Sequence, residues 1–473
     1  MISPLRLIVV LVLLCVGWSA LVWAEQKQCV LTFAEANQLA LQQNPQMLLS
    51  RAKITEAQGA VQQARGYLLP KLHASYSASG SDNGLNVLGM KLNQGQASFN
   101  DFGAGEFDPT ASGGLYVEPD NLNNPGWTRN YQSKLELQIP IFNGGKVYGY
   151  LVKAKAYLNA ANHGDDMACQ QLTFEVLKAY EGVRTAAGFV TVAIKTVQVA
   201  KSYSELTDKL CAQGVVARND QLRAQLNLSA VKLQHSEAQN YLAKSYAQLQ
   251  VLVGFDGQQP FAVAETLEIV MPTDDFAVLR EQMFQHNPGL RALQEQVAAG
   301  SADVEIARAD YLPHFNLMLS EEWNNPDFQV GGHASSMVAG VLSWDVFDFG
   351  VRRGSVNQAN ARLNQQTANL SLMRDRLRLQ LDAAWRDATL AAERVRVCEL
   401  SITQAEEAER LELLRYQKGV STMSELLMIQ AQLDKARNDL VAAKYQQTMQ
   451  RAGILLAIGR LTPDAINSVM SSN

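Results

Sequence analysis

The chain has 473 residues, of which 47% are hydrophobic and 18% are charged, and its formal charge at pH 7 is −5. This mild negative charge argues against nucleic acid as a partner. The five cysteines are widely spaced and form no CxxC pair, so the sequence predicts neither a disulfide framework nor a zinc knuckle.

Residues 1–24 have the features of a secretory signal peptide. Arg6 supplies a positive start, residues 7–16 are apolar, and Val22 and Ala24 offer small side chains at the cleavage positions, so we expect the mature chain to begin at Glu25. No later stretch reaches the roughly 20 apolar residues of a membrane-spanning helix. This leaves an exported soluble protein or a protein that crosses a membrane with strands.

The sequence contains a tandem repeat, with copies at 31–254 and 275–459. A shift of 205 residues relates matching positions in the two copies: Phe142 and Phe347, Gly145 and Gly350, Gly214 and Gly419, and Gly254 and Gly459. Such self-similarity predicts one duplicated structural unit. The copies are joined by a linker at 255–274 and followed by a short tail at 460–473, and together they are expected to form a single structural unit.

Each repeat is predicted to hold three helices, because Ala, Gln and Leu dominate most of the chain and favour helix. The predicted helices cover residues 32–66, 148–213 and 219–253 in the first repeat, and 275–309, 353–417 and 423–457 in the second. At about 1.5 Å per residue, the middle helix of each repeat would be on the order of 100 Å long. Helices of this length do not fit a compact globule.

The long helices carry a seam of small and apolar side chains. Alternating steps of four and three residues lead from Leu172 to Ala200 in the first repeat and from Leu377 to Ala405 in the second. A seven-residue period predicts a left-handed supercoil, and the small side chains allow neighbouring helices to approach closely. Cys398 lies in this seam, and we interpret it as a core residue rather than a redox site.

Between the first and second helix of each repeat, the hydrophobic pattern changes to a period of two. This alternation predicts β-hairpins at about 71–141 and 314–347. Their strands are expected at residues 72–80, 131–141, 315–323 and 338–346. The Gly/Asn-rich segment from Gly80 to Trp127 makes the first repeat 38 residues longer than the second between the matching strands, and is predicted to be a long surface loop.

The same alternation is expected of a half-buried strand pair in a soluble domain and of a water-filled membrane barrel. The export signal and the long helices favour the barrel. Because four strands cannot close a barrel and lipid does not tolerate an open sheet edge, several copies must pool their strands. The predicted fold is therefore mostly α with a membrane β part: a long antiparallel coiled-coil helical barrel, continuous with a 12-stranded β-barrel formed by a trimer with four strands per chain.

Together these features resemble the TolC-like outer-membrane efflux channels of Gram-negative bacteria. The resemblance covers Leu31 to Gly459 and rests on the duplication, on "IPIFNGG" at 139–145 matched by "WDVFDFG" at 344–350, and on "YQKGVSTMSELL" at 416–427. It implies a homotrimer in the outer membrane, in contact with its lipid, whose helical tunnel continues into the periplasm. It also implies two partners, a periplasmic adaptor protein and an inner-membrane pump, in an efflux pump or a type I secretion system.

The resemblance further implies a gate where the inter-helix turns close the periplasmic end of the tunnel. In this comparison Tyr416 ties the inner helix pair to its neighbour. Glu425 lines the narrowest ring, and Asp220 is its counterpart in the first repeat. Three copies of Glu425 at one constriction would favour cations, which makes the closed tip cation-selective by hypothesis.

Two positions depart from the family pattern at this gate. Met428 stands where a second aspartate is usual, and Ser421 stands where an arginine is usual. A double acidic ring and the usual arginine link are therefore in doubt, although Arg218 and Arg223 flank Asp220 and could supply substitute contacts. The turns expected to dock the adaptor contain Gly214, Val215, Gly419 and Val420.

Local structure offers simpler explanations for some of these residues. Thr422 and Glu425 have the spacing of a helix capping box. Gly214 and Gly419 suit the left-handed position that follows a helix C-terminus. Asp220 fits a stabilising charge at a helix start. A cap and a pore-lining acid are compatible roles for one residue.

The sequence lacks the common signatures of catalysis. It contains no HExxH, no GxSxG, no P-loop and no dinucleotide fingerprint, so we expect no enzyme activity, no cofactor and no metal site. The polar cluster at 163–166 (His-Gly-Asp-Asp) interrupts the apolar pattern within the predicted long helix, and a metal contact there is the minor alternative. The alternative function is a soluble periplasmic coiled-coil scaffold without a pore. The transported substrate is not encoded in any recognisable motif.

Overall fold

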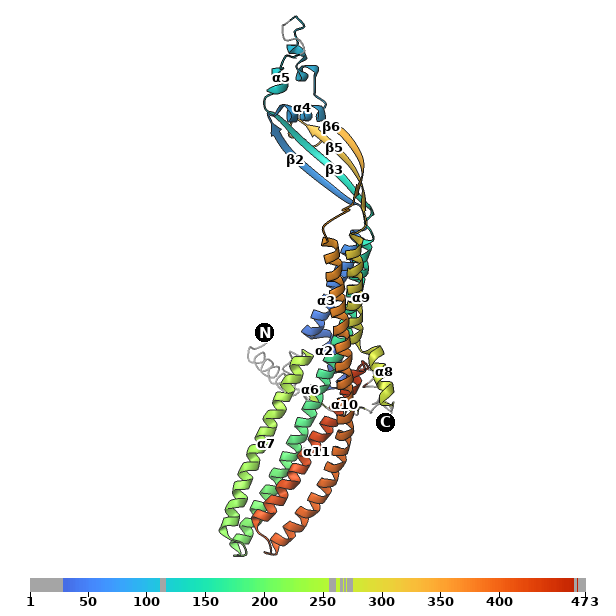
Figure 1. Cartoon of the computed structure of the whole chain (residues 1–473). Helices are drawn as coiled ribbons and strands as arrows, with labels where there is room; N and C mark the ends of the chain where they lie inside the picture. The colour runs from blue at the N-terminus through green and yellow to red at the C-terminus, as the bar shows by residue number, and fades with distance from the viewer. Residues whose placement is uncertain are drawn as a thin grey trace, which may run out of the picture. The chain divides into compact units, whose positions relative to one another are not determined.

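The structure is a computed structural model of the chain (Figure 1). It describes residues 29–110, 116–254, 261–263, 267, 269, 275–462 and 466. The expected signal peptide at 1–24 lies outside the described residues, as do most of the linker and most of the tail. The chain divides into two compact units, one made of Met1–Arg51, Asp165–Pro288 and Arg374–Asn473 and the other of Ala52–Gly164 and Gly289–Met373. We call them the helical unit and the sheet unit.

The helical unit contains the carboxyl-terminal parts of the two long helices and the helices that pack beside them. Its elements are β1 (Cys29–Leu31), α2 (Phe33–Gln43), α6 (Lys146–Ala212) from Asp165 onwards, α7 (Arg218–Val253), β4 (Phe261–Val263), α8 (Phe276–His286), α10 (Val351–Gln417) from Arg374 onwards and α11 (Met423–Ala457). β1 pairs in parallel with β4. Figure 1 shows α7, α6, α11 and α10 side by side as long rods.

The sheet unit combines an antiparallel sheet with the remaining helix segments. Its elements are most of α3 (Pro45–Gly66), β2 (Lys71–Ser81), α4 (Gly84–Asn93), η1 (Phe99–Phe102), η2 (Ala104–Glu106), α5 (Asp120–Asn123), β3 (Thr128–Phe142), α9 (Pro288–Ala309), β5 (His314–Asn325), β6 (His333–Ser343) and the amino-terminal parts of α6 and α10, up to Gly164 and Met373. The strand order is β2-β3-β5-β6, so the two hairpins lie side by side.

The predicted flanking helices at 32–66 and 275–309 are each broken in two, so the expectation of single helices was wrong. The breaks fall at Asn44-Pro45 and Asn287-Pro288. Asn44 has φ −66° and ψ 132°, and Asn287 has φ −62° and ψ 118°. Proline disfavours helical backbone in the residue before it but is well suited to the first helical position. The first helix of each pair therefore ends at the asparagine, and a second begins at the proline.

The predicted long helix at 148–213 is confirmed, since α6 runs unbroken from Lys146 to Ala212 and continues through the polar cluster at 163–166. The single Gly164 costs only about 1 kcal/mol relative to alanine, which a long packed helix tolerates. Two further expectations need correction. The long loop after Gly80 contains short helices. The last strand ends at Ser343 rather than near 347, because its partner β5 begins at His314, which lies opposite Ser343.

The predicted seam is confirmed by burial. In α10 the nine seam positions from Leu377 to Ala405 are all buried or half-buried, while most residues between them are exposed. In α6 the seam begins at Leu172 and Val176, both fully buried. The main core of the helical unit surrounds Tyr180, whose hydroxyl donates to the carbonyl oxygen of Leu31 at 3.0 Å.

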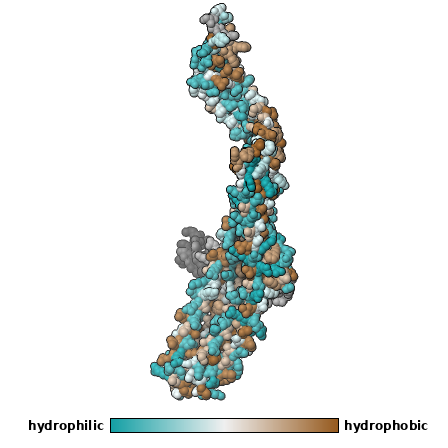
Figure 2. Space-filling model, viewed as in Figure 1, coloured by the Kyte–Doolittle hydropathy of each residue, from teal (hydrophilic) through white to brown (hydrophobic). Residues whose placement is uncertain are grey.

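The sheet has one mainly polar face and one mainly apolar face, as the period-two pattern predicts. On the polar face, the Lys134 ammonium pairs with Glu136 and with Glu322 of the neighbouring strand, each at 3.1 Å. On the other face Leu137 lies opposite Leu319. Figure 2 shows hydrophobic surface gathered where this sheet meets the helices of its own unit. Among the described residues, none of the helices combines the length and hydrophobicity needed to cross a bilayer.

Candidate functional site at the inter-helix turns

The turns that join α6 to α7 and α10 to α11 close in the same way. Gly214 and Gly419 take left-handed backbone, with φ 73° and 70°. The same pair of backbone bonds closes each turn: Gly214 N–H to Cys211 O (3.0 Å) and Val215 N–H to Leu210 O (2.9 Å), and Gly419 N–H to Tyr416 O (2.9 Å) and Val420 N–H to Arg415 O (3.0 Å). Val215 and Val420 are left 51% and 68% exposed. Each turn therefore presents an apolar side chain at its apex.

Tyr416 is the buried centre of this end of the helical unit. Its side chain is fully buried, and its hydroxyl lies 3.3 Å from the hydroxyl of Thr207 in α6. Thr207 donates its own proton to the carbonyl oxygen of Tyr203 at 2.7 Å, so the phenol of Tyr416 is the donor between the two hydroxyls. Burial raises the pKa of Tyr416, which keeps the phenol protonated. The apolar cluster around it contains Tyr203, Ala224, Met423 and Leu426.

Glu425 forms the capping box that its spacing predicts. The backbone N–H of Thr422 donates to the Glu425 carboxylate at 3.0 Å, and the backbone N–H of Glu425 donates to the Thr422 hydroxyl at 3.3 Å. These bonds satisfy donors that α11 leaves unpaired at its start. Glu425 is nevertheless exposed, so its charge faces solvent in the single chain.

The other predicted gate residues lie at the same end but do not form one cluster. Asp220 is half-buried in the first turn of α7, and Arg218 is exposed beside it. Arg223 reaches across to α11, where it donates to the hydroxyl of Ser424. Met428 is 55% exposed. The hydroxyl of Ser421 is buried and has no hydrogen-bond partner among the described residues.

The sequence did not predict a polar layer that lies next to Tyr416, on the side away from the inter-helix turns. It is built from α6, α10 and α11. The Tyr203 hydroxyl donates to Glu409 and lies 3.4 Å from Gln430 Oε1. Gln430 Nε2 donates to Asp434 at 3.1 Å. Tyr203 and Gln430 are only 3% and 4% exposed, so this layer sits inside the helix packing.

An ion pair extends the layer towards the surface. Arg437 of α11 pairs with Glu406 of α10 at 2.9 Å and lies 3.9 Å from Asp434. Burial raises the pKa of Asp434, although hydrogen bonds from Thr196 and Gln430 and the charge of Arg437 oppose the rise. Because burial disfavours the charged form of Asp434, protonation of this acid changes the stability of the layer.

For one residue of the layer, Glu409, a signal was present in the seam itself. Continuing the steps of four and three beyond Ala405 reaches Glu409, Glu412 and Tyr416. In α6 the same continuation beyond Ala200 reaches Ser204 and Thr207. Polar side chains at positions that the heptad assigns to the core predict a buried polar layer, because such groups must find partners inside.

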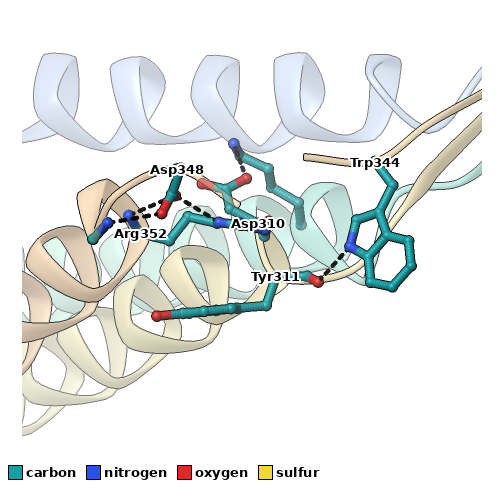
Figure 3. Close-up of polar contacts among 7 residues, drawn as sticks. Asp310, Tyr311, Trp344, Asp348 and Arg352 are labelled. Carbon is teal, nitrogen blue, oxygen red and sulfur yellow. Dashed lines mark hydrogen bonds and ion pairs between the residues drawn. The ribbon is translucent and has the colours of Figure 1, made fainter. Parts of the chain in front are cut away.

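A second polar network lies where the strands meet the helices of the sheet unit (Figure 3). Arg352 binds the Asp348 carboxylate at 2.6 Å, donates to the carbonyl oxygen of Asp310 at 3.3 Å and stacks 5.1 Å from the ring centre of Tyr311. The indole of Trp344 donates to the Tyr311 carbonyl at 3.1 Å. The network fixes the segment between β6 and α10 against the end of α9.

The described residues include no group of three or more His, Cys, Asp or Glu side chains that could hold a metal ion. The polar contacts join helices and turns to one another, as expected of groups that control packing rather than chemistry.

Comparison with known proteins identifies the class. The chain is 24% identical over 329 residues to the alkaline protease secretion protein AprF of Pseudomonas aeruginosa, covering 67% of both chains. It is 20% identical over 419 residues to the proteases secretion protein PrtF of Dickeya chrysanthemi, covering 87% of this chain and 84% of PrtF.

The fold is shared with solved outer-membrane proteins. The structure of CusC superposes with a TM-score of 0.76 at 16% identity, covering 90% of this chain and 91% of CusC. The outer membrane protein VceC of Vibrio cholerae superposes with a TM-score of 0.74 at 19% identity, covering 90% of this chain and 96% of VceC.

The fold and these matches define an outer-membrane export channel and not an enzyme. The family model of outer membrane efflux proteins matches residues 36–255 and 279–460. The chain belongs to the outer membrane efflux protein family. The resemblance to TolC-like channels seen in the sequence is therefore confirmed.

Proposed function

We propose that three copies of the chain assemble into a duct across the outer membrane, gated at the inter-helix turns. The observation that carries the proposal is the four-stranded sheet, which ends in two unpaired edge strands, β2 and β6, among the described residues. Unpaired backbone groups are costly in lipid, so each edge requires a strand from another copy. Three such sheets would close a barrel of twelve strands.

The outer helices of the helical unit support assembly independently. α7 exposes Leu222, Leu226 and Leu233 at 55%, 73% and 62%. α10 exposes Leu379 and Leu390 at 71% and 66%. Rows of exposed leucines on long helices indicate that another helix covers them. In the proposed trimer, the α7 row of one copy packs against the α10 row of the next.

Aromatic residues near the end of the sheet support its contact with lipid. Trp344, Phe347 and Phe349 are 56%, 74% and 92% exposed, and they follow β6 directly. Exposed aromatics at one level are typical of the boundary between hydrocarbon and water. The network around Arg352 holds the backbone that carries them.

The tandem repeat is part of the proposal. Its support is one contact that occurs at equivalent positions: Asn44 donates to the carbonyl oxygen of Leu252 at 3.1 Å, and Asn287 donates to that of Ala457 at 3.0 Å. Leu252 and Ala457 are related by the repeat shift of 205 residues. The family model also matches in two segments.

Assembly is tested on the full-length protein purified in detergent. Native mass spectrometry and electron microscopy should show three copies around a central pore. Leu226→Glu should weaken the trimer, because it places a charge in the covered row, whereas Lys232→Glu on exposed α7 surface should not. Monodisperse single subunits without a pore would overturn the proposal and favour the soluble scaffold.

For the cargo we propose polypeptides. AprF and PrtF are named as protease secretion proteins, and this chain matches each over two thirds of its length or more. A periplasmic adaptor and an inner-membrane pump would then dock at the turns that expose Val215 and Val420. Deletion of the gene should remove specific proteins from the culture medium and leave drug susceptibility unchanged. The reverse result would assign small-molecule efflux instead.

A further inference from the structure

A pocket of about 600 Å³ lies in the sheet unit, where the polar face of the sheet meets the helices. Lys71 of β2 and His314 of β5 line it from the strands. Tyr67, which follows α3, and Tyr150 of α6 line it from the helical side. Every lining residue belongs to one chain and to one unit, so the pocket exists before any assembly.

The polar groups that line the pocket favour a negatively charged ligand. Lys71 carries a positive charge, His314 offers a ring nitrogen, and Gln138 and Asn316 offer amide N–H donors. None of the described lining side chains is acidic. Two tyrosine rings form apolar walls beside these donors. Such a lining suits a ligand with a negative head and a flat apolar body.

Lys71 differs from the other cations at this junction. Lys146 pairs with Asp310 at 2.6 Å, and Arg352 pairs with Asp348 at 2.6 Å (Figure 3). For Lys71 the described residues supply no carboxylate within ion-pair distance, only the face of the Tyr67 ring at 5.1 Å. A cation held over an aromatic ring at the edge of a pocket keeps its donors available to a ligand.

Lys71 is also held in register with the rest of the pocket. It lies opposite Gln138 in the β2–β3 pairing, so both side chains project from the same face of the sheet. The Tyr67 hydroxyl accepts a hydrogen bond from Gln63 at 3.1 Å, which fixes the ring beneath the ammonium. Strand pairing and this bond together pre-organise the cation and its aromatic support.

We propose that this pocket binds small aromatic anions, with Lys71 as the residue that recognises the negative group and the tyrosine rings holding the flat body. The shared chemistry is a carboxylate or phosphate on an aromatic ring. On the face that the proposed duct turns to its interior, such a site would retain anionic solutes at the junction of strands and helices. Binding itself does not depend on the duct.

The test is equilibrium binding by titration calorimetry to the full-length protein in detergent. The probes are benzoate, phenyl phosphate and the neutral analogue benzamide. At least one anion should bind saturably, and benzamide should bind roughly tenfold more weakly, because charge-assisted hydrogen bonds contribute most of the affinity. The stronger of the two anions identifies carboxylate or phosphate as the preferred group.

Variants decide which residue is responsible. Lys71→Gln should weaken anion binding by roughly tenfold, while Lys71→Arg should retain it, because the charge is the recognising feature. Lys155→Gln removes the same charge from exposed α6 surface in the same unit and should leave binding unchanged. Circular dichroism of each variant checks that it is folded. Absence of saturable anion binding, or equal binding by Lys71→Gln, would overturn the proposal. Neither result would bear on the trimer, which mass spectrometry tests separately.

Discussion

The phenol of Tyr416 donates to the hydroxyl of Thr207 across 3.3 Å, and both side chains are fully buried. This contact links the last turn of α10 to α6. Because Thr207 commits its own proton to the Tyr203 carbonyl, the link depends on a single donor. Tyr416 therefore serves as both a packing aromatic and a polar contact between α10 and α6.

Removing that donor should destabilise the end of the helical unit that carries the inter-helix turns. Tyr416→Phe keeps the ring but deletes the hydroxyl, and the loss of one buried hydrogen bond should cost about 1 kcal/mol in the free energy of unfolding. In planar bilayers the variant should show a higher basal conductance than the wild type. Tyr241→Phe, on a residue that is 51% exposed in α7, is the matched control. Unchanged stability and conductance would mean that Tyr416 acts through packing alone.

The charge of Glu425 and its hydrogen bond in the helix cap can be tested separately. Glu425→Gln preserves an acceptor for the Thr422 backbone, so stability should stay close to that of the wild type. If the residue lines a constriction in the trimer, cation selectivity in single-channel recordings should fall. Unchanged selectivity would leave Glu425 with the cap as its only role.

Thr422 gives the complementary experiment. Thr422→Ala removes the side chain that accepts from the Glu425 backbone, and the helix should lose about 1 kcal/mol. Thr422→Ser retains the hydroxyl and should lose little. Hydrogen exchange of the first turn of α11 measures the difference directly. Equal protection in both variants would show that tertiary packing, and not the cap, holds the start of this helix.

The polar layer next to Tyr416 should respond to acid. Burial raises the pKa of Asp434 above its ordinary value of 3.8, so the folded state binds the proton more tightly than the unfolded state does. The stabilising effect of protonation is therefore complete below the unfolded pKa and is lost as the pH rises through the folded pKa. The groups around it are Thr196, Tyr203, Glu406, Glu409, Gln430 and Arg437.

Asp434→Asn should remove this dependence. The variant should be more stable than the wild type at neutral pH, because an amide replaces a desolvated charge, and the difference should shrink on acidification. Denaturant unfolding across the acidic range provides the measurement. Asp439→Asn, on an exposed acid of the same helix, controls for general charge effects. A wild-type advantage at neutral pH would show that the contact with Arg437 outweighs burial.

The paired asparagines should have matching effects. Asn44→Ala and Asn287→Ala each remove a buried donor to the carboxyl-terminal end of a neighbouring helix, which should cost about 1–3 kcal/mol. Exposed Asn240→Ala should be within about 0.5 kcal/mol of the wild type. Thermal unfolding compares the three variants. Strongly unequal losses at the two sites would argue against equivalent roles in the two repeats.

The seven-residue seam and the period-two segments were enough to predict the long helices and the paired strands, whereas the family was predicted from the duplication and the motifs at 139–145, 344–350 and 416–427. These are local and periodic features, and the spacing of apolar residues states directly which face of an element is covered. The shift of 205 residues added the repeat. Gly214 and Gly419 likewise marked the turns, because left-handed backbone after a helix favours glycine.

Other features were decided only in three dimensions. Nothing local indicates that Tyr203, Gln430 and Asp434, from helices far apart in the sequence, meet in one layer, or that Arg223 finds Ser424 rather than an acid. The pocket around Lys71 also requires strand register and helix ends together. Periodicity determines which face of an element is buried, whereas the partner it meets depends on how the elements pack, and that information lies in the tertiary structure.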